Sequence, residues 1–435
     1  MRFLNTQTDP PARITAALTQ SNSLDLPEVE AAVRAILADV RARGDAAVRD
    51  CLRRYDGVEL EALEASEAEY AAAERAVDPE FRRAVEVSIA NVRAFHERQR
   101  EESWTHEEDG ACLGHVVRPL ARVGIHAPGG KAPLPSTVIM AAVPARVAGV
   151  REVIACSPPR KDGTANPFTL FAARAAGVDR FYKMGGAQGI AAMAFGTESV
   201  PRVDKIVGPG NPYTVLAKRL VFGHVDIESL PGPTEVVVIA DDTADPRWVA
   251  ADLLSQAEHG ADSLVVLLTP SERLGRAVAA ETERQAATLS RADTVRECLA
   301  AHGWVIVTRD LAEACELASR CAPEHLELVV ADPDAWVDRI ENAGAIFIGP
   351  YTPEPIGDYI AGPSHILPTG GTARFSSPLH LDDFVKKTSI LRYSRERFER
   401  EAAHVIRLAE AETLDAHANA VRVRLEGGGG PPRQT

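Results

Sequence analysis

The sequence lacks the features of a disulfide-rich or zinc-ribbon protein. Its 435 residues include only six cysteines, and no two of them form a Cys-x-x-Cys pair. They are Cys51, Cys112, Cys156, Cys298, Cys315 and Cys321. Scattered cysteines of this kind favour a reducing compartment.

Membrane-spanning and nucleic-acid-binding features are also missing. The most apolar run, from Thr137 to Val150, is interrupted by Pro144 and Arg146 and is shorter than the ~20 residues that cross a bilayer. The N-terminal residues contain no cationic stretch followed by an apolar core, so we expect no signal peptide. Acidic residues (62) outnumber basic ones (48), the net charge is −14, and no basic stripe would neutralise phosphates. These absences predict a cytoplasmic protein whose partners are neither membranes nor nucleic acids.

The composition that is present is that of an ordinary globular protein. Hydrophobic residues make up 45% of the chain and charged residues 25%. A chain of this length can bury large cores without disulfides, and ~150 residues per domain would give about three domains.

Helical patterns near both ends of the chain enclose a region in which strands and helices alternate. Apolar residues at helical spacing from Val29 to Val40, with Gly44 as a stop, predict one helix, and further helices are expected over 46–55, 60–99 and 385–425. Short β-branched or apolar runs lie at 116–117, 153–156, 235–239, 264–268, 304–307, 328–330 and 345–348. Their alternation with helices predicts an α/β fold with two clusters of parallel strands, one before and one after Pro231 to Pro233.

The segment from Ser255 to Gly260 could bind a metal. Gln256 and His259 are three residues apart, so a helix would present both on one face. An amide oxygen and an imidazole nitrogen are acceptable zinc ligands. The alternative is a capped helix end with an exposed histidine, and one short motif does not decide between the two.

The segment from Ala322 to Glu327 places an acid beside an imidazole. Pro323 favours an extended Ala322, so Glu324 and His325 are expected on a loop or at a helix start. Together they would supply two proton-transfer groups. Taken alone, the segment fits a charged helix N-terminus better.

Two segments farther along the chain carry more candidate ligands. The glycine-dense stretch from Gly357 to Phe375 is a long loop, in which Asp358 could ligate a metal and His365 could contact a substrate. The alternative is a glycine-rich connection with solvated side chains. Glu412 and His417 lie in a helical stretch and by themselves predict only a surface helix.

Three glycine-rich segments follow apolar runs without forming a standard dinucleotide fingerprint. They are 128–130, 185–189 and 208–211. Glycines let a backbone approach a phosphate closely. However, Tyr213 stands where a G-x-G-x-x-G motif starting at Gly208 would end, and tight turns explain the glycines as well.

Taken together, these segments resemble the histidinol dehydrogenase family. Seven motifs occur in the family's order, and the similarity spans nearly the whole chain apart from its extreme ends. The motifs are 128–130, 185–188, 208–211, 255–260, 322–327, 365–374 and 412–417, and the segment 39–47 is similar as well.

The resemblance implies an NAD-dependent alcohol and aldehyde dehydrogenase that oxidises L-histidinol to L-histidine through the aldehyde, with two NAD, as the last step of histidine biosynthesis. It also implies one zinc ion per subunit and a homodimer with a shared active site. The implied zinc ligands, which also contact the substrate, are Gln256, His259, Asp358 and, from the other subunit, His417. Further substrate contacts are implied for Thr234, His325, His365 and Glu412. The implied NAD contacts are His126, Gln188 and Asn211.

The family fold has two larger α/β domains with incomplete Rossmann-like parallel sheets and small helical segments from the two chain ends. On this basis we expect an N-terminal segment (1–20), a first α/β domain (21–125 with 233–379) and a second α/β domain (126–232). A helical arm (380–426) and a disordered tail (427–435) would follow.

Within this reaction, two residues are our candidates for moving protons. A base must remove the alcohol proton as hydride leaves, and we assign this role to His325. The aldehyde must then add water before the second hydride can leave, and we assign the activation of that water to Glu324.

Two departures from the family pattern keep other functions open. The family usually has Tyr at the position of His126 and Ser at the position of Thr234. A related dehydrogenase acting on another amino alcohol or a diol is the nearest alternative, although His365 and Glu412 favour histidinol. A zinc hydrolase that needs no NAD and a thioester-forming oxidation through Cys321 are further hypotheses, and Cys321 fits a small buried residue better.

Overall fold

The structure of the protein is a computed structural model that describes residues 1–19, 26–129 and 133–426. It contains two compact units. Unit 1 comprises Met1–Arg100 and Pro119–Phe384, and unit 2 comprises Glu101–Arg118 and the chain from Val385 onward. The residues expected to form a disordered tail, 427–435, lie outside the described residues.

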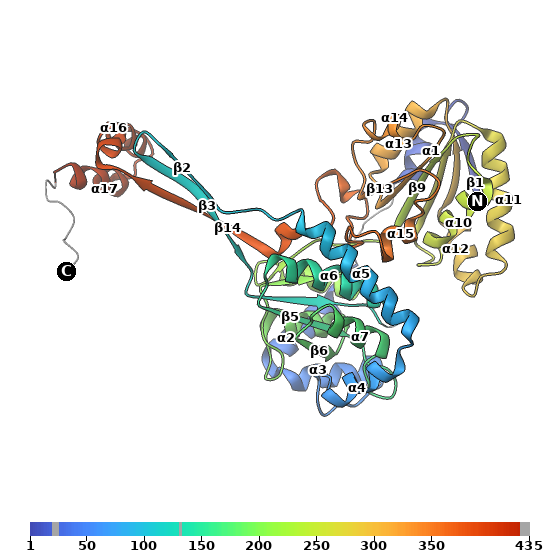
Figure 1. Ribbon diagram of the computed structural model, residues 1–435, viewed down its shortest axis with the longest axis horizontal. Helices are drawn as coiled ribbons and strands as arrows, with labels where there is room; N and C mark the ends of the chain where they lie inside the picture. Colours follow the sequence, from blue (N-terminus) through green and yellow to red (C-terminus); the bar gives the residue numbers. More distant parts are fainter. Residues whose placement is uncertain (20–25, 130–132, 427–435) are drawn as a thin grey trace. The chain divides into compact units, whose positions relative to one another are not determined.

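Unit 1 contains two parallel sheets, and both follow the strand order of a Rossmann-like sheet (Figure 1). One has the order β6-β5-β4-β7-β8 and the other β1-β11-β10-β9-β12-β13. Counted along the chain, each contains the order 3-2-1-4-5, with β1 added at the edge of the second. The five-stranded sheet consists of β4 (Arg122–His126), β5 (Glu152–Ser157), β6 (Arg180–Lys183), β7 (Lys205–Val207) and β8 (Asp226–Ile227). The six-stranded sheet consists of β1 (Arg2–Asn5), β9 (Glu235–Ala240), β10 (Leu264–Thr269), β11 (Gly303–Val307), β12 (His325–Val329) and β13 (Ala345–Ile348).

Helices cover both faces of the five-stranded sheet. In β5, Val153 and Ala155 belong to one hydrophobic cluster, while Ile154 and Cys156 belong to another, as the alternation of a strand requires. The first cluster includes residues of α4 (Glu67–Ala76), α5 (Pro79–Glu97), α6 (Pro135–Ala148) and α7 (Pro167–Ala175). The second includes residues of α2 (Pro27–Arg43), α3 (Asp45–Cys51), the π-helical turn Leu52–Asp56, α8 (Gly186–Phe195) and α9 (Pro212–Val221).

The six-stranded sheet is covered in the same way. In β9, Val237 and Ile239 face one cluster, and Val236 and Val238 face the other. The first cluster involves α1 (Pro11–Leu18), α13 (Leu311–Cys321) and α14 (Asp334–Val337), and the second involves α10 (Pro246–Ala257), α11 (Glu272–Ala286) and α12 (Ala292–His302). The short helix α15 (Glu354–Tyr359) contacts α10. This contact positions the site described below.

Unit 2 combines a small sheet with two helices. Strands β2 (Trp104–Glu108) and β3 (Ala111–Pro119) form an antiparallel hairpin, and β14 (Val385–Tyr393) lies on the other side of β3. Helices α16 (Arg395–Ala411) and α17 (Asp415–Glu426) pack against each other.

The expected α/β class is confirmed, and one expected helix is corrected. The stretch 385–425 becomes helical only at Arg395, because Val385–Tyr393 pairs with β3 as a strand. The stretch 60–99 contains two helices, because Pro79 cannot continue α4 and the Asp78 side chain accepts a hydrogen bond from Phe81 N to begin α5. The predicted helix from Val29 to Val40 is α2, which ends at Gly44 with φ of 55°.

The contacts differ from the expected domain boundaries in three places. Residues 2–5 do not form a separate segment but pair in parallel with β11. Helices between residues 27 and 97 pack on the five-stranded sheet and not on the sheet of residues 233–379. The compact unit that holds the C-terminal helices begins at Val385 and also takes in 101–118.

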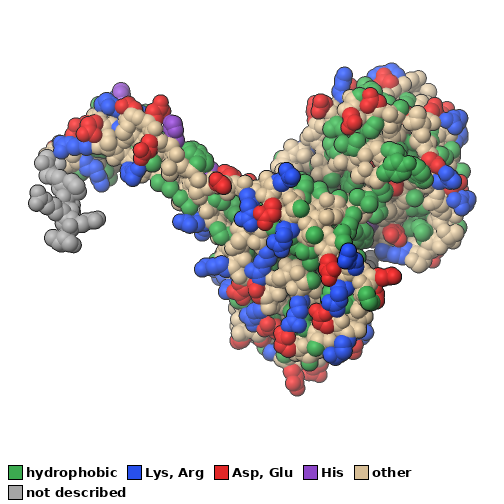
Figure 2. Space-filling model, in the orientation of Figure 1, with side chains coloured by type: hydrophobic (Ala, Val, Ile, Leu, Met, Phe, Trp, Pro, Cys, Tyr) green, Lys and Arg blue, Asp and Glu red, His purple; other side chains and the backbone are tan. Residues whose placement is uncertain are grey.

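The surface agrees with the charge pattern of the sequence. On the face seen in Figure 2, basic and acidic side chains are interspersed and form no stripe of one sign. Among the helices of the described chain, none combines the length and apolar character needed to cross a membrane.

Candidate active site

A buried polar cluster lies at the amino ends of the neighbouring strands β9 and β12. These strands run in parallel, with His325 opposite Val236. Thr234 and Glu324 each precede the first residue of a strand, so the register brings the two side chains together. Glu324 and His325 are 8% and 3% exposed. Glu324 and His325 were expected on a loop or at a helix start. Glu324 does lie in a loop, whereas His325 is the first residue of strand β12.

A chain of hydrogen bonds joins Gln256, Thr234 and Glu324. The amide nitrogen of Gln256 donates to the Thr234 hydroxyl, which in turn donates to Oε2 of Glu324. The same Oε2 accepts from the backbone nitrogen of Glu235 at 3.1 Å. The other polar atom of this amide, Oε1, is buried and has no hydrogen-bond partner among the residues that the structure describes. An unsatisfied oxygen in a fully buried side chain is costly unless it accepts from, or coordinates, another group.

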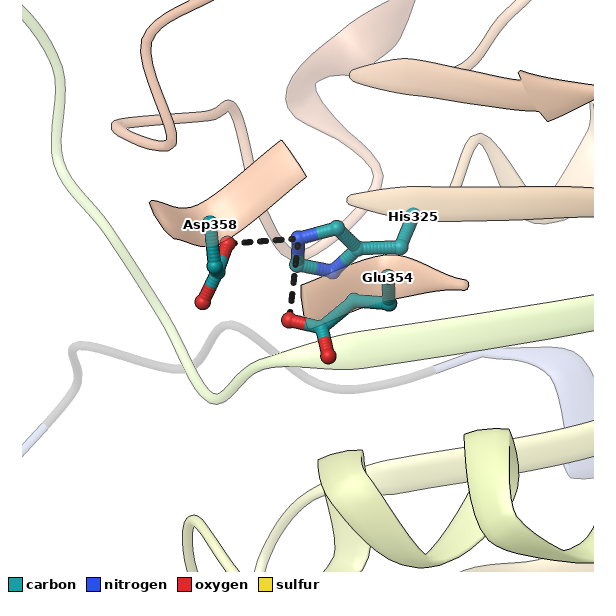
Figure 3. Close-up of side chains that lie close together, drawn as sticks. All are labelled: His325, Glu354 and Asp358. Carbon is teal, nitrogen blue, oxygen red and sulfur yellow. Dashed lines mark ion pairs between the residues drawn. The ribbon is translucent and has the colours of Figure 1, made fainter. Parts of the chain in front are cut away.

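The imidazole of His325 lies among carboxylates, as Figure 3 shows. Its Nδ1 atom is 3.1 Å from the carbonyl oxygen of Glu235, which assigns the proton to that nitrogen. Its Nε2 atom lies 3.8 Å from Oδ1 of Asp358 and 3.9 Å from Oε1 of Glu354. Burial alone would lower the pKa of His325, but Glu324, Asp358 and Glu354 outweigh it and raise that pKa to about 10.

The pKa values of the acids around His325 are shifted in opposite directions. Burial raises the pKa of Glu324, and it raises the pKa of Glu354 to about 8 with help from the charge of Asp358. Burial would also raise the pKa of Asp358, but the imidazoles of His325 and His365 reverse this and hold it well below its usual range. Asp358 is therefore the carboxylate that stays ionised, while Glu324 holds its proton more tightly than an exposed glutamate.

His365 completes the buried cluster, and the exposed His259 lies near it. His259 follows the end of α10, and its Nδ1 atom is 3.0 Å from the carbonyl oxygen of Ser255, which leaves Nε2 free to act as a ligand. His365 contacts the backbone oxygen of Asp358 through Nδ1 (3.0 Å) and the Thr137 hydroxyl through Nε2 (3.2 Å). Burial lowers the pKa of His365, and the charge of His259 adds to this effect.

The donor set fits a divalent cation such as zinc. It offers the unpaired Oε1 of Gln256, an imidazole whose second nitrogen is oriented by a backbone carbonyl, and the ionised carboxylate of Asp358. A second set of possible ligand atoms, from His325, Glu354 and Asp358, lies within 4.8 Å of one another. Both sets share Asp358, so a cation in this region would have Asp358 as a ligand in either case.

The residues predicted to contact NAD lie at the other sheet. His126 ends β4, Gln188 lies in the first turn of α8, and Asn211 caps α9 through a hydrogen bond from Thr214 N (3.1 Å). All three follow the carboxyl ends of parallel strands, where dinucleotides bind in this topology. Their cofactor role stays a prediction.

The two predicted site residues of the C-terminal arm belong to unit 2. Glu412 follows the last residue of α16, and His417 lies in the first turn of α17. Both are exposed. Their roles in substrate and zinc binding also stay predictions.

Several residues of the cluster were not predicted from the sequence. Glu354 donates from its backbone nitrogen to Glu327 (2.9 Å) and accepts from the Ser255 hydroxyl (3.0 Å). Its spacing of four residues before Asp358, with a proline on either side, was a signal that both face one side of a short helix. Glu235 was also missed; burial raises its pKa to about 8, and its carboxylate accepts from Glu324 N (3.2 Å).

Cys321 does not have the environment of a nucleophile. It is 5% exposed, its sulfur contacts the carbonyl oxygen of Leu18 at 3.3 Å, and burial raises its pKa well above the usual value. Reactive cysteines have a lowered pKa. The hypothesis of a thioester formed on Cys321 is therefore not supported by its surroundings.

Fold and site together define an α/β enzyme with two Rossmann-like sheets and a buried cluster of acids and imidazoles, three of whose side chains could hold a metal ion. The comparisons with known proteins give the family. The family model described as histidinol dehydrogenase matches residues 19–425. Histidinol dehydrogenase from Heliobacterium mobile is 52% identical over 94% of this chain and 96% of its own length, and that from Moorella thermoacetica is 52% identical over 92% and 95%. The crystal structure of histidinol dehydrogenase from Elizabethkingia anophelis superposes with a TM-score of 0.91 at 36% identity, covering 98% of both chains.

The chain belongs to the histidinol dehydrogenase family. It is accordingly an oxidoreductase of the alcohol and aldehyde type, in the pathway of histidine biosynthesis.

A pair of carboxyl groups behind the cluster gives a prediction for stability. Asp252 on α10 and the buried Glu327 on β12 share a hydrogen bond. Burial raises the pKa of Asp252 to about 6 and that of Glu327 well above its usual value. Because the folded protein binds these protons more tightly than the unfolded chain, their contribution to stability falls as pH rises from about 4 through the folded-state pKa values.

We expect Glu327→Gln to preserve this arrangement and remove part of its pH dependence. The glutamine oxygen can accept from Glu354 N, and its amide can donate to Asp252 as the protonated acid does. Melting temperatures measured from pH 5 to 9 should fall less steeply with pH than those of the wild type. Glu327→Ala is the matched control and should be destabilised at every pH. A Glu327→Gln curve parallel to the wild-type curve would contradict the shared proton.

Proposed function

We propose that this chain catalyses the zinc-dependent, four-electron oxidation of L-histidinol to L-histidine, through L-histidinaldehyde, with two NAD. The observation that carries the proposal is the buried pair Glu324–His325 beside the unpaired Oε1 of Gln256 and the carboxylate of Asp358. This places two proton-transfer groups against a cation-binding donor set. The family membership supplies the substrate class.

The zinc ligands that we propose are Gln256, His259 and Asp358, with His417 from the partner subunit. When bound, zinc would hold the imidazole and amino nitrogens of the substrate and supply positive charge beside the carboxylates of the cluster. Thr234, His325, His365 and Glu412 are the further substrate contacts that we propose.

We assign to His325 the removal of the alcohol proton in the first oxidation. Its Nδ1–H group is held by the carbonyl oxygen of Glu235, so Nε2 is the nitrogen that exchanges a proton. The surrounding carboxylates raise its pKa to about 10, so the ring must first lose the proton on Nε2, and the positive charge of a bound zinc ion would favour that loss. The hydride passes to NAD as this proton leaves, which gives the aldehyde, NADH and a proton. Positioning of the alcohol carbon against the nicotinamide would account for much of the rate.

Glu324 is suited to act in the second oxidation. Water adds to the aldehyde, and the resulting hydrate loses a second hydride to a second NAD to give the carboxylate. Burial raises the pKa of Glu324, so its carboxylate is a stronger base than an exposed one and can take a proton from the attacking water. The hydrogen bonds from Thr234 and Glu235 N fix its orientation.

The NAD site that we propose lies at the carboxyl ends of β4, β6 and β7. Helices α8 and α9 begin there, at the glycine-rich segments 185–189 and 208–211, so backbone N–H groups and helix dipoles can receive phosphates. His126, Gln188 and Asn211 are the contacts that we assign to this site.

We also propose a homodimer in which unit 2 contacts the partner. This unit exposes large apolar side chains on its strand and helices, including Leu391 (71% exposed) and Leu408 (67%). Exposed apolar groups of this kind are typical of a protein–protein interface. The six cysteines are all free and buried, which fits a reducing compartment, and we place the enzyme in the cytoplasm on that ground.

The proposed function predicts the stoichiometry and metal dependence of the reaction. Zinc-loaded protein with limiting L-histidinol and excess NAD should form two NADH per histidinol consumed, as measured by absorbance. A chelator should abolish the reaction and added zinc should restore it. NADH formation from other amino alcohols or diols, but none from histidinol, would instead support a related dehydrogenase, and turnover of an amide without NAD would support a hydrolase.

Glu324→Gln should slow the aldehyde step more than the alcohol step. Loss of a general base typically lowers the rate about 10²-fold or more. We expect a decrease of this size in the rate with histidinaldehyde as substrate. The rate at which the first NADH forms from histidinol, measured in a single turnover, should decrease less. Glu235→Gln is the matched control, because this neighbouring buried acid orients the Glu324 backbone and should affect both steps alike. Equal slowing of the two steps by Glu324→Gln would contradict the division of roles.

His417→Ala should lower zinc content and activity, because the substitution removes one of four proposed ligands. Metal analysis after dialysis measures the first effect, and His404→Ala, an exposed histidine on the neighbouring α16, is the control. Mixed dimers of His417→Ala and Gln256→Ala subunits test whether the site is shared. An exchanged arm leaves one intact site per mixed dimer and restores activity, whereas an arm that serves its own subunit leaves none.

A further inference from the structure

A buried ion pair holds both backbone polar groups of one residue, Gly208, in the loop that follows β7. Lys218 on α9 donates to the carbonyl oxygen of Gly208 at 3.0 Å. Glu228, just after β8, accepts from the backbone nitrogen of Gly208 at 2.8 Å. Lys218 and Glu228 also contact each other, at 2.8 and 2.7 Å. The amide and the carbonyl of a single glycine are therefore held by two side chains that hold each other.

All three N–H donors of Lys218 have a partner within this group of residues. Lys218 has three N–H donors, and they reach Gly208 O and the two carboxylate oxygens of Glu228. The side chains of Lys218 and Glu228 are 0% and 3% exposed. Because the positive charge is neutralised and enclosed, it cannot act as a surface attraction for anions. Its effect on the loop must be geometric.

The backbone at Gly208 needs such support. Its φ is +115°, and a Cβ atom there would lie 2.1 Å from the backbone oxygen of His126. Only glycine can adopt this conformation and approach, and glycine is also the residue that constrains the chain least. The conformation of the loop must therefore be fixed from outside.

His126 fixes the next residue of the same loop. Its Nδ1 atom donates to the carbonyl oxygen of Pro209 at 2.8 Å, and its Nε2 atom accepts from Gly186 N at 3.3 Å. Burial lowers the pKa of His126 to about 4, so the ring is neutral and serves as both donor and acceptor. It thereby joins the loop after β7 to the start of α8, the two segments to which we assign the NAD phosphates.

We propose that Lys218 and Glu228 are positioning residues for NAD, which hold the loop from Gly208 to Asn211 in the conformation that receives the cofactor. The assignment rests on the proposed NAD site. A buried ion pair is rarely needed for stability, since apolar or neutral groups of similar volume often replace it without loss. This pair lies at the switch point between β4 and β7, where a displaced backbone would directly alter a dinucleotide site.

The test is the double variant Lys218→Met/Glu228→Gln. Methionine preserves the volume of lysine, and the glutamine oxygen can still accept from Gly208 N, so we expect a folded protein by circular dichroism and thermal melting. We expect the NAD dissociation constant, measured by calorimetry, to rise about 10-fold, because a misplaced loop loses phosphate contacts. This increase in the dissociation constant should be the same at low and high salt, because the enclosed ion pair acts through geometry and not through attraction of the phosphates. KM for NAD should rise in parallel while kcat changes by less than about threefold.

A control pair lies at the amino ends of β7 and β8. Lys205 at the start of β7 is 8% exposed and pairs at 2.9 Å with Asp226 of β8, whose side chain is 51% exposed, and at 3.2 Å with Asp383. Lys205→Met/Asp226→Asn removes this more exposed pair at the opposite end of the strands and should leave NAD affinity within about twofold of the wild type. Histidinol affinity should be unchanged in both double variants.

Three results would overturn the assignment. One is unchanged NAD affinity in the folded Lys218/Glu228 variant, and another is equal weakening in the Lys205/Asp226 control. The third needs no variant: the Gly208 amide of the wild-type protein without NAD should be protected from hydrogen exchange, and rapid exchange would mean that the loop is not held. Wild-type protein that binds no NAD at all would refute the proposed cofactor itself, and the assignment with it.

Discussion

The register between β9 and β12 is the constraint on which the site depends. With His325 opposite Val236, the residues that precede and begin the two strands bring Thr234, Glu235, Glu324 and His325 into one cluster. Along β12, His325 and Glu327 point to the side of α10 and α15, while Leu326 and Leu328 belong to the hydrophobic cluster of α13. A slip of one residue would exchange these faces, burying acids among leucines and placing leucines in the site.

This register concentrates negative charge in the interior. Glu235, Glu324, Glu327 and Glu354 are all nearly inaccessible to solvent, and Asp358 lies beside them. The protein accommodates them in two ways: burial raises the pKa of the glutamates, and the protonated His325 pairs with the ionised Asp358. Groups with pKa values pushed in opposite directions are typical of acid–base sites. The unpaired oxygen of Gln256 in the same cluster could act as a ligand for a cation.

The sequence predicted the structure best where the residues of a single helix or strand determine its conformation. The apolar spacing of α2 and the runs that form β5, β9, β10 and β11 are local patterns, and local patterns can be read directly. Strands β1, β6, β7 and β8 have four residues or fewer and were not predicted, because so short a run has no measurable period. Strand β14 was mistaken for a helix because its charged residues fit a surface helix equally well, and only its pairing with β3 decides.

The site itself could be predicted only in part. Motif resemblance named Glu324, His325 and Asp358, but not Glu354, which also raises the pKa of His325, or Glu235, which accepts from Glu324 N. Glu354 lies 29 residues after His325 in the chain, and Glu235 lies 89 residues before Glu324. Nor could the sequence show that the cluster lies at the amino ends of β9 and β12. In Rossmann-like sheets, ligands bind at the carboxyl ends, and only the five-stranded sheet keeps its glycine-rich loops there.

The two proposed sites thus lie at opposite edges of their sheets, and a single helix links those edges. Helix α6 follows β4 and the first glycine-rich segment, and two of its residues contact the loop of His365. The Thr137 hydroxyl lies 3.2 Å from Nε2 of His365, and the Met140 carbonyl oxygen accepts from the Ser364 hydroxyl at 3.3 Å. Since Nδ1 of His365 contacts the backbone of Asp358, a continuous path of contacts runs from the five-stranded sheet to Asp358. The residues of α6 from Ser136 to Ala145 are all buried, and close packing of this kind transmits a displacement, so a shift of α6 would move the groups at both proposed sites.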